Sequence, residues 1–478
     1  MSLGDTIAAV ATAPGRGGVA VIRVSGPEAF QVAERLTGRI PTPRRVSLES
    51  IRVGLESVRD PTPTLIDTAV VLAFKAPHSY TGEDVVEFQC HGGSVTPRRV
   101  LEACLASGAR FAHRGEFTER AFLNGRLSYE EAESVLDLVD AKTDRGADAA
   151  LRGLTGESRR ETQDIYKALV DLSSTVEHAL DVSEEELPDG FCSGIASSVA
   201  AIAARLDAAI RRAKEGKILR DGALVVIAGP PNAGKSSLLN ALLGESRAIV
   251  SATPGTTRDS IEEWLDICGW PVRLVDTAGL RETADAIEGE GVARARDLVE
   301  RADIVLNLTP ADGDPAGGTC GTVAVIEVLS KCDLIANSED YGSRYHSAVS
   351  RSTIATQEES TGHGFRTQSG GAVARTTTIG VIPISAKTGE GLDALRGAIA
   401  AELERKAAEP GDTDSALGRD AAALVEARAL LSPTPPLADL VLLANRVRAA
   451  AERLGEGIGA TYSADMLNAL FSRFCVGK

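Results

Sequence analysis

Four short apolar runs occur in the middle of the chain, at residues 223–228, 272–275, 323–329 and 381–384. The first has no charged residue and is rich in β-branched side chains, as expected of a strand that is buried on both faces. Residues 238–243 after it have the apolar pattern of a helix. The runs predict an α/β domain, which we place at residues 217–403.

The N-terminal part has a different pattern. Residues 1–124 contain short β-rich runs at 19–24, 68–74 and 84–89. They also contain helical patterns near 27–37 and 96–107. Strands and helices mixed in this way are typical of an α+β domain.

The chain from residue 129 to about 216 reads as nearly all helix, interrupted near 187–190. A helical pattern returns after residue 416. We therefore predict a multidomain α/β protein in which a discontinuous helical domain (125–216 and 404–478) encloses the inserted α/β domain, because inserted domains keep their termini close. Residues 336–378 are rich in Ser, Thr and Gly, which predicts a disordered surface insertion between two strands.

Composition narrows the classes of partner. The net charge of −16 argues against a protein coated in nucleic acid or bound to an anionic membrane. A basic cluster at residues 211–220 is open to two interpretations, a solvated helix face or a local binding face, and the first is favoured. The seven cysteines are scattered and form no CxxC pair, which favours a reducing cytosol. With no signal segment and no 18-residue apolar run, we expect a soluble cytoplasmic protein with no membrane partner.

A phosphate-binding loop follows the first apolar run. Residues 229–237 read Gly-Pro-Pro-Asn-Ala-Gly-Lys-Ser-Ser, with a predicted strand before them and a helix after. In such a loop backbone N–H groups surround a β-phosphate, Lys235 reaches the β/γ oxygens, and Ser236 offers its hydroxyl to Mg²⁺. The other interpretation is a glycine turn with an exposed lysine; the flanking elements favour a P-loop.

Later motifs select the nucleotide. Asp276-Thr277-Ala278-Gly279 ends the second apolar run, where an aspartate can hold the Mg²⁺ shell and the Gly279 N–H can meet a γ-phosphate. Thr257 lies between the two motifs and can complete the ligands of the metal.

Two further motifs follow the last two runs. Asp333, in Lys331-Cys332-Asp333, can accept from the two donors on the Watson–Crick edge of guanine, and Ser385-Ala386-Lys387 can place N–H groups near its O6. The alternative, an ATPase, gives no reason for Asp333 and Ser385. The motifs in this order predict a Ras-like P-loop G domain.

Several segments resemble the MnmE (TrmE) family of tRNA-modification GTPases. They are 15–26, Tyr80-Thr81-Gly82-Glu83-Asp84, His91-Gly92-Gly93, 115–125, 254–259 and the final Phe474-Cys475-Val476-Gly477-Lys478. The resemblance covers essentially the whole chain. It implies a GTP-hydrolysing homodimer that acts with an MnmG-type FAD protein, as a heterotetramer, to install an aminomethyl-type group at C5 of the wobble uridine of certain tRNAs.

The resemblance also implies a reduced folate, 5-formyl- or methylene-tetrahydrofolate, in the N-terminal domain. Its site would use Arg23, Glu87 and Arg126, with Lys478 reaching in from the C-terminus. Two folate carboxylates suit cationic partners, and a pterin edge suits a carboxylate. From the residues alone, Arg23 reads as a strand-end surface charge and Glu87 as half of a salt bridge.

Hydrolysis needs a group that balances the charge developing between the phosphates. A Ras-like glutamine is missing after Gly279, where Leu280 stands, and no arginine finger can be assigned. The resemblance implies K⁺ instead, bound by Asn232, Ser251, Thr253 and Thr256 and completed when two G domains meet. It also implies that Glu288 orients the attacking water; Glu282 and Glu290 are nearby competitors.

The motifs and the resemblance together give one set of nucleotide-binding residues. They are Asn232, Ala233, Gly234, Lys235, Ser236, Ser237, Ser251, Ala252, Thr253, Pro254, Gly255, Thr256, Thr257, Asp276, Thr277, Ala278, Gly279, Lys331, Asp333, Ser385, Ala386 and Lys387. Ser236 and Thr257 are the expected Mg²⁺ ligands.

Two positions remain open. The Asn-Lys-x-Asp motif of the family is Ser330-Lys331-Cys332-Asp333 here, and we expect serine to be too short both to tie this loop to the P-loop and to contact guanine N7. The departure should weaken nucleotide affinity and spare specificity. Cys475 is either a buried structural thiol or a reactive thiol near the folate.

A second class of function is a switch without its own chemistry, such as an Era- or Der-like ribosome-assembly GTPase. An Era-like chain would carry a basic RNA-binding domain after its G domain, and a Der-like chain a second P-loop. Neither is found in the sequence. The N-terminal segments and the Cys-x-Gly-Lys end favour the tRNA-modifying enzyme.

Overall fold

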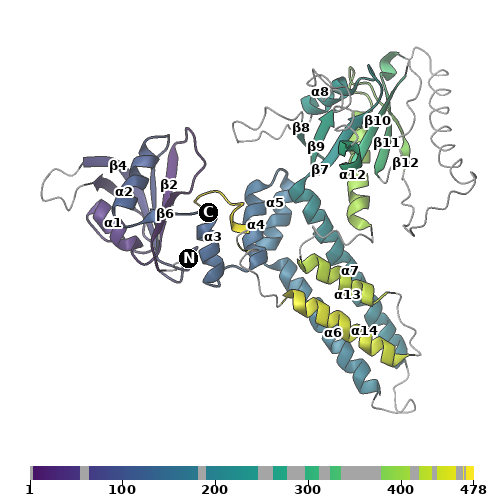
Figure 1. Cartoon of the computed structure of the whole chain (residues 1–478), viewed down its shortest axis with the longest axis horizontal. Coiled ribbons are helices and arrows are strands. Elements are labelled where there is room, and N and C mark those ends of the chain that lie inside the picture. The colour runs from purple at the N-terminus through teal and green to yellow at the C-terminus, as the bar shows by residue number, and fades with distance from the viewer. Residues whose placement is uncertain are drawn as a thin grey trace, which may run out of the picture. The chain divides into compact units, whose positions relative to one another are not determined.

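The computed structural model describes residues 4–53, 64–180, 190–245, 262–276, 297–311, 323–334, 378–409, 419–432, 439–458, 467 and 470–477. The chain divides into two compact units (Figure 1). Unit 1 takes in Met1–Val139, Leu151–Glu157 and Gly459–Lys478. Unit 2 takes in Asp140–Ala150 and Ser158–Ile458.

Unit 1 is built on a six-stranded sheet in the order β3-β4-β5-β2-β1-β6. Its strands are β1 (Ile7–Val10), β2 (Val19–Ser25), β3 (Ser47–Val53), β4 (Thr64–Phe74), β5 (Val85–His91) and β6 (Arg110–Phe111). All pairs are antiparallel except β1 with β6. Helices α1 (Ala29–Thr37) and α2 (Thr96–Ala106) share one apolar core with the sheet. The α+β prediction is confirmed.

The C-terminal residues belong to the same unit. Helices α3 (Glu116–Leu123) and α4 (Tyr129–Asp140) follow the sheet, and Ser128 and Glu131 cap the start of α4 by reciprocal hydrogen bonds. Leu470, Phe471 and Phe474 are buried against the apolar face of α4. The two ends of the chain therefore fold together in one unit.

The helical part of unit 2 joins segments from both sides of the insertion. It contains α6 (Glu157–Leu180), α7 (Phe191–Asp221), α13 (Arg419–Leu430) and α14 (Leu440–Ile458), whose apolar residues form one core. Helix α5 (Asp144–Leu154) precedes them. In the basic cluster on α7, Arg212 pairs with Glu161 and Lys214 donates to the Glu409 carbonyl, so these two side chains have structural partners.

Among the described helices, α7 is long and apolar enough to pass a length-and-composition test for a membrane span. Its residues Ile195, Val199, Ile202 and Leu206 lie in the helical core, which accounts for the apolar character of the helix. The boundary predicted at 216/217 lies inside α7, and the one at 403/404 lies inside α12 (Leu392–Ala408). The chain has no structural break at either position.

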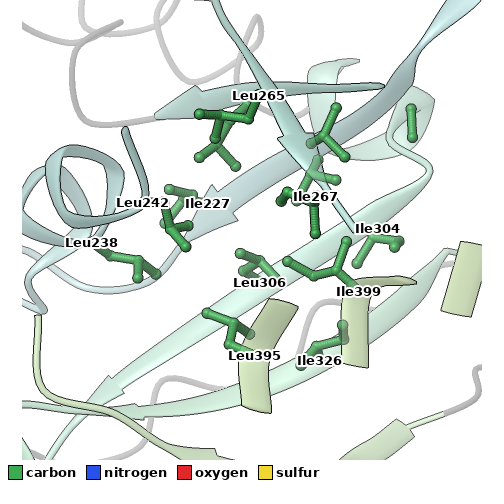
Figure 2. Packing of buried hydrophobic residues seen from close by; sticks show 14 of the residues in the cluster. Ile227, Leu238, Leu242, Leu265, Ile267, Ile304, Leu306, Ile326, Leu395 and Ile399 are labelled. Atoms are coloured by element: carbon green, nitrogen blue, oxygen red, sulfur yellow. The ribbon is translucent and has the colours of Figure 1, made fainter. Parts of the chain in front are cut away.

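The second sheet has the order β12-β11-β10-β7-β9-β8. Its strands are β7 (Ala223–Ala228), β8 (Glu262–Ile267), β9 (Trp270–Asp276), β10 (Ile304–Pro310), β11 (Ala324–Ser330) and β12 (Thr378–Pro383). Only β8 is antiparallel to its neighbour. Figure 2 shows α8 (Lys235–Glu245) and α12 placing leucines and isoleucines on one face of this sheet. All four strands predicted here are present.

Four of these parallel strands, β7, β9, β11 and β12, end beside the predicted motifs. Parallel strands bring their carboxyl ends to one edge, where ligands bind in open α/β sheets. Residues 335–377, which hold nearly all of the predicted disordered insertion, lie outside the described residues.

Candidate functional site

The P-loop begins directly after β7 and ends where α8 starts. Gly229 has φ 145°, and a Cβ there would lie 2.5 Å from the Leu308 carbonyl oxygen, so the turn requires glycine. Gly234 has φ 92°. Asn232 also has a positive φ, 62°, and is exposed at the tip of the loop. The chain therefore makes the strand–turn–helix arrangement that the motif predicts.

Lys235 and Ser236 stand at the start of α8. The Lys235 ammonium donates to the carbonyls of Gly229 and Pro230, at 3.1 and 2.9 Å, so the lysine folds back over its own loop. Ser236 donates from Oγ to Asp276 Oδ2 at 2.7 Å. The helix N-terminus and these side chains form a site suited to phosphate oxygens.

Asp276 ends β9, the strand beside β7, and is almost fully buried. The hydroxyl of Ser236 and the carboxylate of Asp276 supply two oxygens close together. Mg²⁺ prefers oxygen ligands and keeps several waters, so this pair fits one side of its coordination shell. Ala233, Gly234 and Ser237 lie in the same loop-to-helix segment.

The base-binding side lies at the ends of β11 and β12. Asp333 is exposed and accepts a hydrogen bond at 2.8 Å from the hydroxyl of Ser385, which is fully buried. Main-chain bonds join the two loops, from Cys332 N–H to Ile384 O and from Ile384 N–H to Leu329 O. Ser385 thus orients one carboxylate oxygen of Asp333. Lys331, with φ 60°, Ala386 and Lys387 flank this arrangement.

Ser330 corrects the sequence expectation. Its buried hydroxyl donates to the Ala233 carbonyl at 2.5 Å, so the serine does tie the base-binding loop to the P-loop. The side chain is short, but the end of β11 lies close enough to the P-loop for it to reach. Sequence reasoning missed this contact because the distance between two loops is set by the sheet and not by the motif.

Part of the predicted nucleotide site lies outside the described residues. This part comprises Ser251, Ala252, Thr253, Pro254, Gly255, Thr256, Thr257, Thr277, Ala278, Gly279 and Glu288. Of the K⁺ ligands, Asn232 alone is described, and of the Mg²⁺ ligands, Ser236.

In unit 1, Arg23 and Glu87 face each other across β2 and β5. The Arg23 Nε donates to Glu87 at 2.8 Å, and the guanidinium lies over the rings of Tyr80 and Phe117. The interpretation of Glu87 as half of a salt bridge is confirmed. Arg23 is a half-buried residue in the middle of its strand, so its interpretation as a strand-end surface charge is wrong.

A cavity of about 360 Å³ adjoins this ion pair. It is lined by Arg44, Phe74, His78, Ser79, Tyr80, Val85, Glu87 and Arg126. Two arginines, a carboxylate and aromatic walls suit a ligand with a flat ring and anionic groups, such as a folate. Burial raises the pKa of Tyr80, against a hydrogen bond with Thr118 and the charge of Arg23. Arg44, Phe74 and His78 carried no signal in the sequence; Tyr80 lies in one of the family-like segments.

The C-terminal segment lies against the same unit. Val476 bridges to Arg114, and Gly477, with φ 105°, is packed so closely that a Cβ would lie 2.2 Å from the Val10 carbonyl oxygen. Val10 follows Ala9, which pairs with Arg23 in the sheet. Cys475 is exposed, so a buried thiol is excluded. Lys478 lies outside the described residues.

A charge network around Arg120, a buried residue of α3, was not predicted. Arg120 is 2 % exposed and donates to Asp5, Glu83 and Glu116, and Arg110 also pairs with Asp5 and Glu116. Burial alone would raise the pKa of Glu116, but hydrogen bonds from Arg110, His113 and Arg120 bring it below its usual value. Asp5 and Glu83 come from distant parts of the chain, and no local pattern marks them as partners of Arg120.

Two family models match the chain. One, described as the GTP-binding protein TrmE N-terminus, matches residues 6–126, and the other, the MnmE helical domain, matches residues 130–475. The second match encloses the G domain, as a discontinuous helical domain requires.

Curated relatives match over the full length. A tRNA modification GTPase MnmE of Azoarcus sp. (strain BH72) is 42% identical over 99% of this chain and 98% of its own. One of Symbiobacterium thermophilum is 40% identical over 99% of each chain. A solved structure, the G domain of the T. maritima FeoB iron transporter, is 22% identical over 39% of this chain and 99% of its own, with a TM-score of 0.23. Its score is too low to add to the full-length matches. The chain therefore belongs to the MnmE (TrmE) family of tRNA modification GTPases.

Proposed function

We propose that this chain, as a homodimer in the cytoplasm and together with an MnmG-type FAD protein, installs an aminomethyl-type group at C5 of the wobble uridine of certain tRNAs. A reduced folate bound in the N-terminal domain is the one-carbon donor, and GTP hydrolysis in the G domain drives the cycle. For the domains we keep the order expected from the sequence, at 1–124, 125–216 with 404–478, and 217–403, although α7 and α12 run across the boundaries at 216/217 and 403/404.

One observation carries the proposal: a single chain holds both a phosphate site and a cavity suited to a folate. In the first, Ser236 and Asp276 lie 2.7 Å apart at the start of α8. In the second, Glu87 and Arg126 line a cavity of about 360 Å³. A switch without modification chemistry has no use for the second site.

In the N-terminal site each side chain has a distinct task. Arg126 suits a carboxylate of the folate tail, and Glu87, held in place by Arg23, suits the donors of a pterin edge. The packing of Gly477 on β1 supports a C-terminus that completes this site, with Lys478 as a further cation and Cys475 as an accessible thiol. The bound folate supplies a one-carbon unit.

In the G domain, Lys235 and the N-terminus of α8 hold the phosphates, and Asp333 holds guanine. The exposed position and positive φ of Asn232 are consistent with a cation ligand at the tip of the P-loop. We propose that K⁺, bound by Asn232, Ser251, Thr253 and Thr256, balances the developing charge, and that Glu288 orients the attacking water.

Turnover in different salts tests the G-domain proposal. GTP hydrolysis should be slow in Na⁺ and faster in K⁺ at matched ionic strength, and Glu288→Ala should bind GTP yet lose most of the K⁺ stimulation. Equal rates of GTP hydrolysis in the two salts would contradict the proposed K⁺ site. A Glu288→Ala variant with an unchanged rate would move the water-orienting role to Glu282 or Glu290.

Mass spectrometry of wobble uridines tests the function as a whole. A strain that lacks the chain should lose the C5-modified uridine and regain it with the wild-type gene. Cys475→Ser nearly preserves volume and removes the thiolate, so a serine variant that restores the modification fully would make the thiol dispensable. If the strain that lacks the chain instead keeps the wild-type level of modified wobble uridine and accumulates ribosomal subunits, the chain is an assembly GTPase.

A further inference from the structure

The hydroxyl of Ser330 stands between the two halves of the nucleotide site. It ends β11 and is 4 % exposed. Its Oγ lies 2.5 Å from the carbonyl oxygen of Ala233 in the P-loop and 3.4 Å from that of Thr309 at the end of β10. Both neighbours are acceptors, so the hydroxyl acts here as a donor.

A serine hydroxyl has one hydrogen. At 2.5 Å that hydrogen belongs to the bond with Ala233, and the Thr309 oxygen lies at the limit of hydrogen-bond distance. Guanine N7 is an acceptor only. Ser330 therefore has no hydrogen left to donate to N7 while it holds the P-loop. An asparagine amide has two N–H donors, which is enough for a P-loop carbonyl and for N7 together.

The other polar edge of guanine is served from a different place. Asp333 is exposed, and its Oδ1 is oriented by Ser385 at 2.8 Å. Recognition of N1–H and the exocyclic amine by Asp333 does not involve Ser330. The contact that fixes the loop and the contact that reads the base are thus carried by separate side chains.

From this geometry we propose that Ser330 is a positioning residue that fastens the base-binding loop to the P-loop, and that the site leaves guanine N7 without a hydrogen bond from this position. The proposal rests on the assignment of guanine to Asp333. It sharpens the base specificity of the site: the chain reads the Watson–Crick edge and tolerates changes at N7.

Calorimetric titration of the full chain with GDP and with 7-deaza-GDP, both with Mg²⁺, tests it. In 7-deaza-GDP a C–H group replaces N7, and the Watson–Crick edge is unchanged. Wild type should bind the two within about twofold of each other. Ser330→Asn should gain a three- to tenfold preference for GDP, about the effect of one hydrogen bond.

Two more variants separate fastening from base reading. Ser330→Ala should weaken both nucleotides equally, by about three- to tenfold, because one buried hydrogen bond is lost. Ser330→Thr keeps the hydroxyl and should bind both as wild type does, which also controls for general damage at a buried position. Unfolding temperatures without nucleotide show that each variant is folded.

Three results would overturn the proposal: a wild-type chain that disfavours 7-deaza-GDP by fivefold or more, a Ser330→Ala variant that binds both nucleotides as wild type does, or a Ser330→Asn variant without a preference. A separate titration with ADP tests the assignment of guanine to Asp333. If the chain binds ADP as tightly as GDP, that assignment is wrong. That outcome removes the proposal with the site on which it rests.

Discussion

The cavity that Glu87 lines in unit 1 and the loop that holds Asp333 in unit 2 fix their carboxylates in different ways. Glu87 is paired with the guanidinium of Arg23, at 2.8 Å. Asp333 is oriented by the hydroxyl of Ser385 and, in the part of the chain that the structure describes, is in no ion pair. A hydroxyl fixes a carboxylate without compensating its charge. Asp333 therefore offers a ligand a full charge, whereas a ligand at Glu87 must share the carboxylate with an arginine.

The same difference between an arginine partner and a neutral partner governs two glutamates, Glu116, which is buried, and Glu327, which is half-buried. Burial raises the pKa of Glu116 in unit 1, but the hydrogen bonds from Arg110, His113 and Arg120 outweigh it and the pKa is lowered. Burial also raises the pKa of Glu327 in unit 2, and its hydrogen bonds from the Asn307 amide offset only part of this. The partner, and not burial alone, decides the direction of the shift.

The largest effect is expected from replacing Arg120, which should lower the stability of unit 1. Arg120→Ala leaves Asp5, Glu83 and Glu116 without their shared buried cation, which should destabilise unit 1 by about 3–5 kcal/mol. Hydrogen exchange of the β2 and β5 amides, followed by mass spectrometry, measures the stability of unit 1. GTP hydrolysis should be much less affected, because the P-loop lies in unit 2.

A matched arginine serves as the control. Arg98 pairs with Glu102 on the surface of α2, with side chains 60% and 56% exposed, so Arg98→Ala should cost less than about 1 kcal/mol. Equal exchange in the two variants would mean that the buried network contributes no more than a surface pair.

The nucleotide site was more predictable from the sequence than this network. Lys235, Asp276, Asp333 and Ser385 each lie within a few residues of a strand end, and parallel strands bring those ends to one edge. A motif behind an apolar run is therefore enough to find them.

The remaining features depend on distances that the sequence does not contain. Asp5 and Arg120 meet only because β1, β6 and α3 fold together, and no local motif links them. The contact of Ser330 with Ala233 depends on the spacing of β11 and the P-loop. Strands β1 and β3 were also not predicted; β1 has only four residues, and in β3 the adjacent polar residues Glu49 and Ser50 break the alternation that marks a strand.

The next largest effect is expected at Asp333, the carboxylate that Ser385 and not an arginine orients. Asp333→Asn replaces an acceptor with a donor opposite guanine N1–H, so GDP affinity should fall by about a hundredfold. Xanthosine diphosphate carries an oxygen in place of the exocyclic amine and should bind the variant better than GDP does. Ser385→Ala should cost less, because it only loosens the orientation of Asp333. A variant that keeps the wild-type preference for GDP would place the base elsewhere.

The C-terminal segment gives a smaller effect that is confined to unit 1. Gly477→Ala puts a Cβ 2.2 Å from the Val10 carbonyl oxygen, which should displace the last residues and reduce tRNA modification while GTP hydrolysis stays near wild type. Gly93 has nearly the same backbone, φ 101° against 105°, with no atom within 4 Å of an added Cβ. Gly93→Ala therefore carries the same strain without the clash. If both variants modify tRNA equally well, the close packing of Gly477 is not needed.

The smallest expected effect is the opposite response of the two glutamates to pH. Because the folded-state pKa of Glu116 is lowered from 4.5, its contribution to the stability of unit 1 is complete above that pH and is lost as the pH falls. Burial raises the pKa of Glu119 in the same helix, which works against this trend. The informative comparison is therefore between wild type and Glu116→Gln. In the variant, the hydrogen-exchange protection of α3 should fall less as the pH is lowered.

Glu327 has the reverse sign. Its folded-state pKa is raised, so its ionised form destabilises unit 2 above that pKa, and the cost disappears as the pH falls towards 4.5. Glu327→Gln should therefore stabilise unit 2 at pH 7 and have little effect at pH 4.5. The chain has two tryptophans, Trp264 and Trp270, and both lie in unit 2, so tryptophan fluorescence during urea unfolding follows this unit alone. A glutamine variant that is less stable than wild type at pH 7 would mean that Asn307 fully compensates the half-buried charge of Glu327. The contrast between arginine and neutral partners would then not hold.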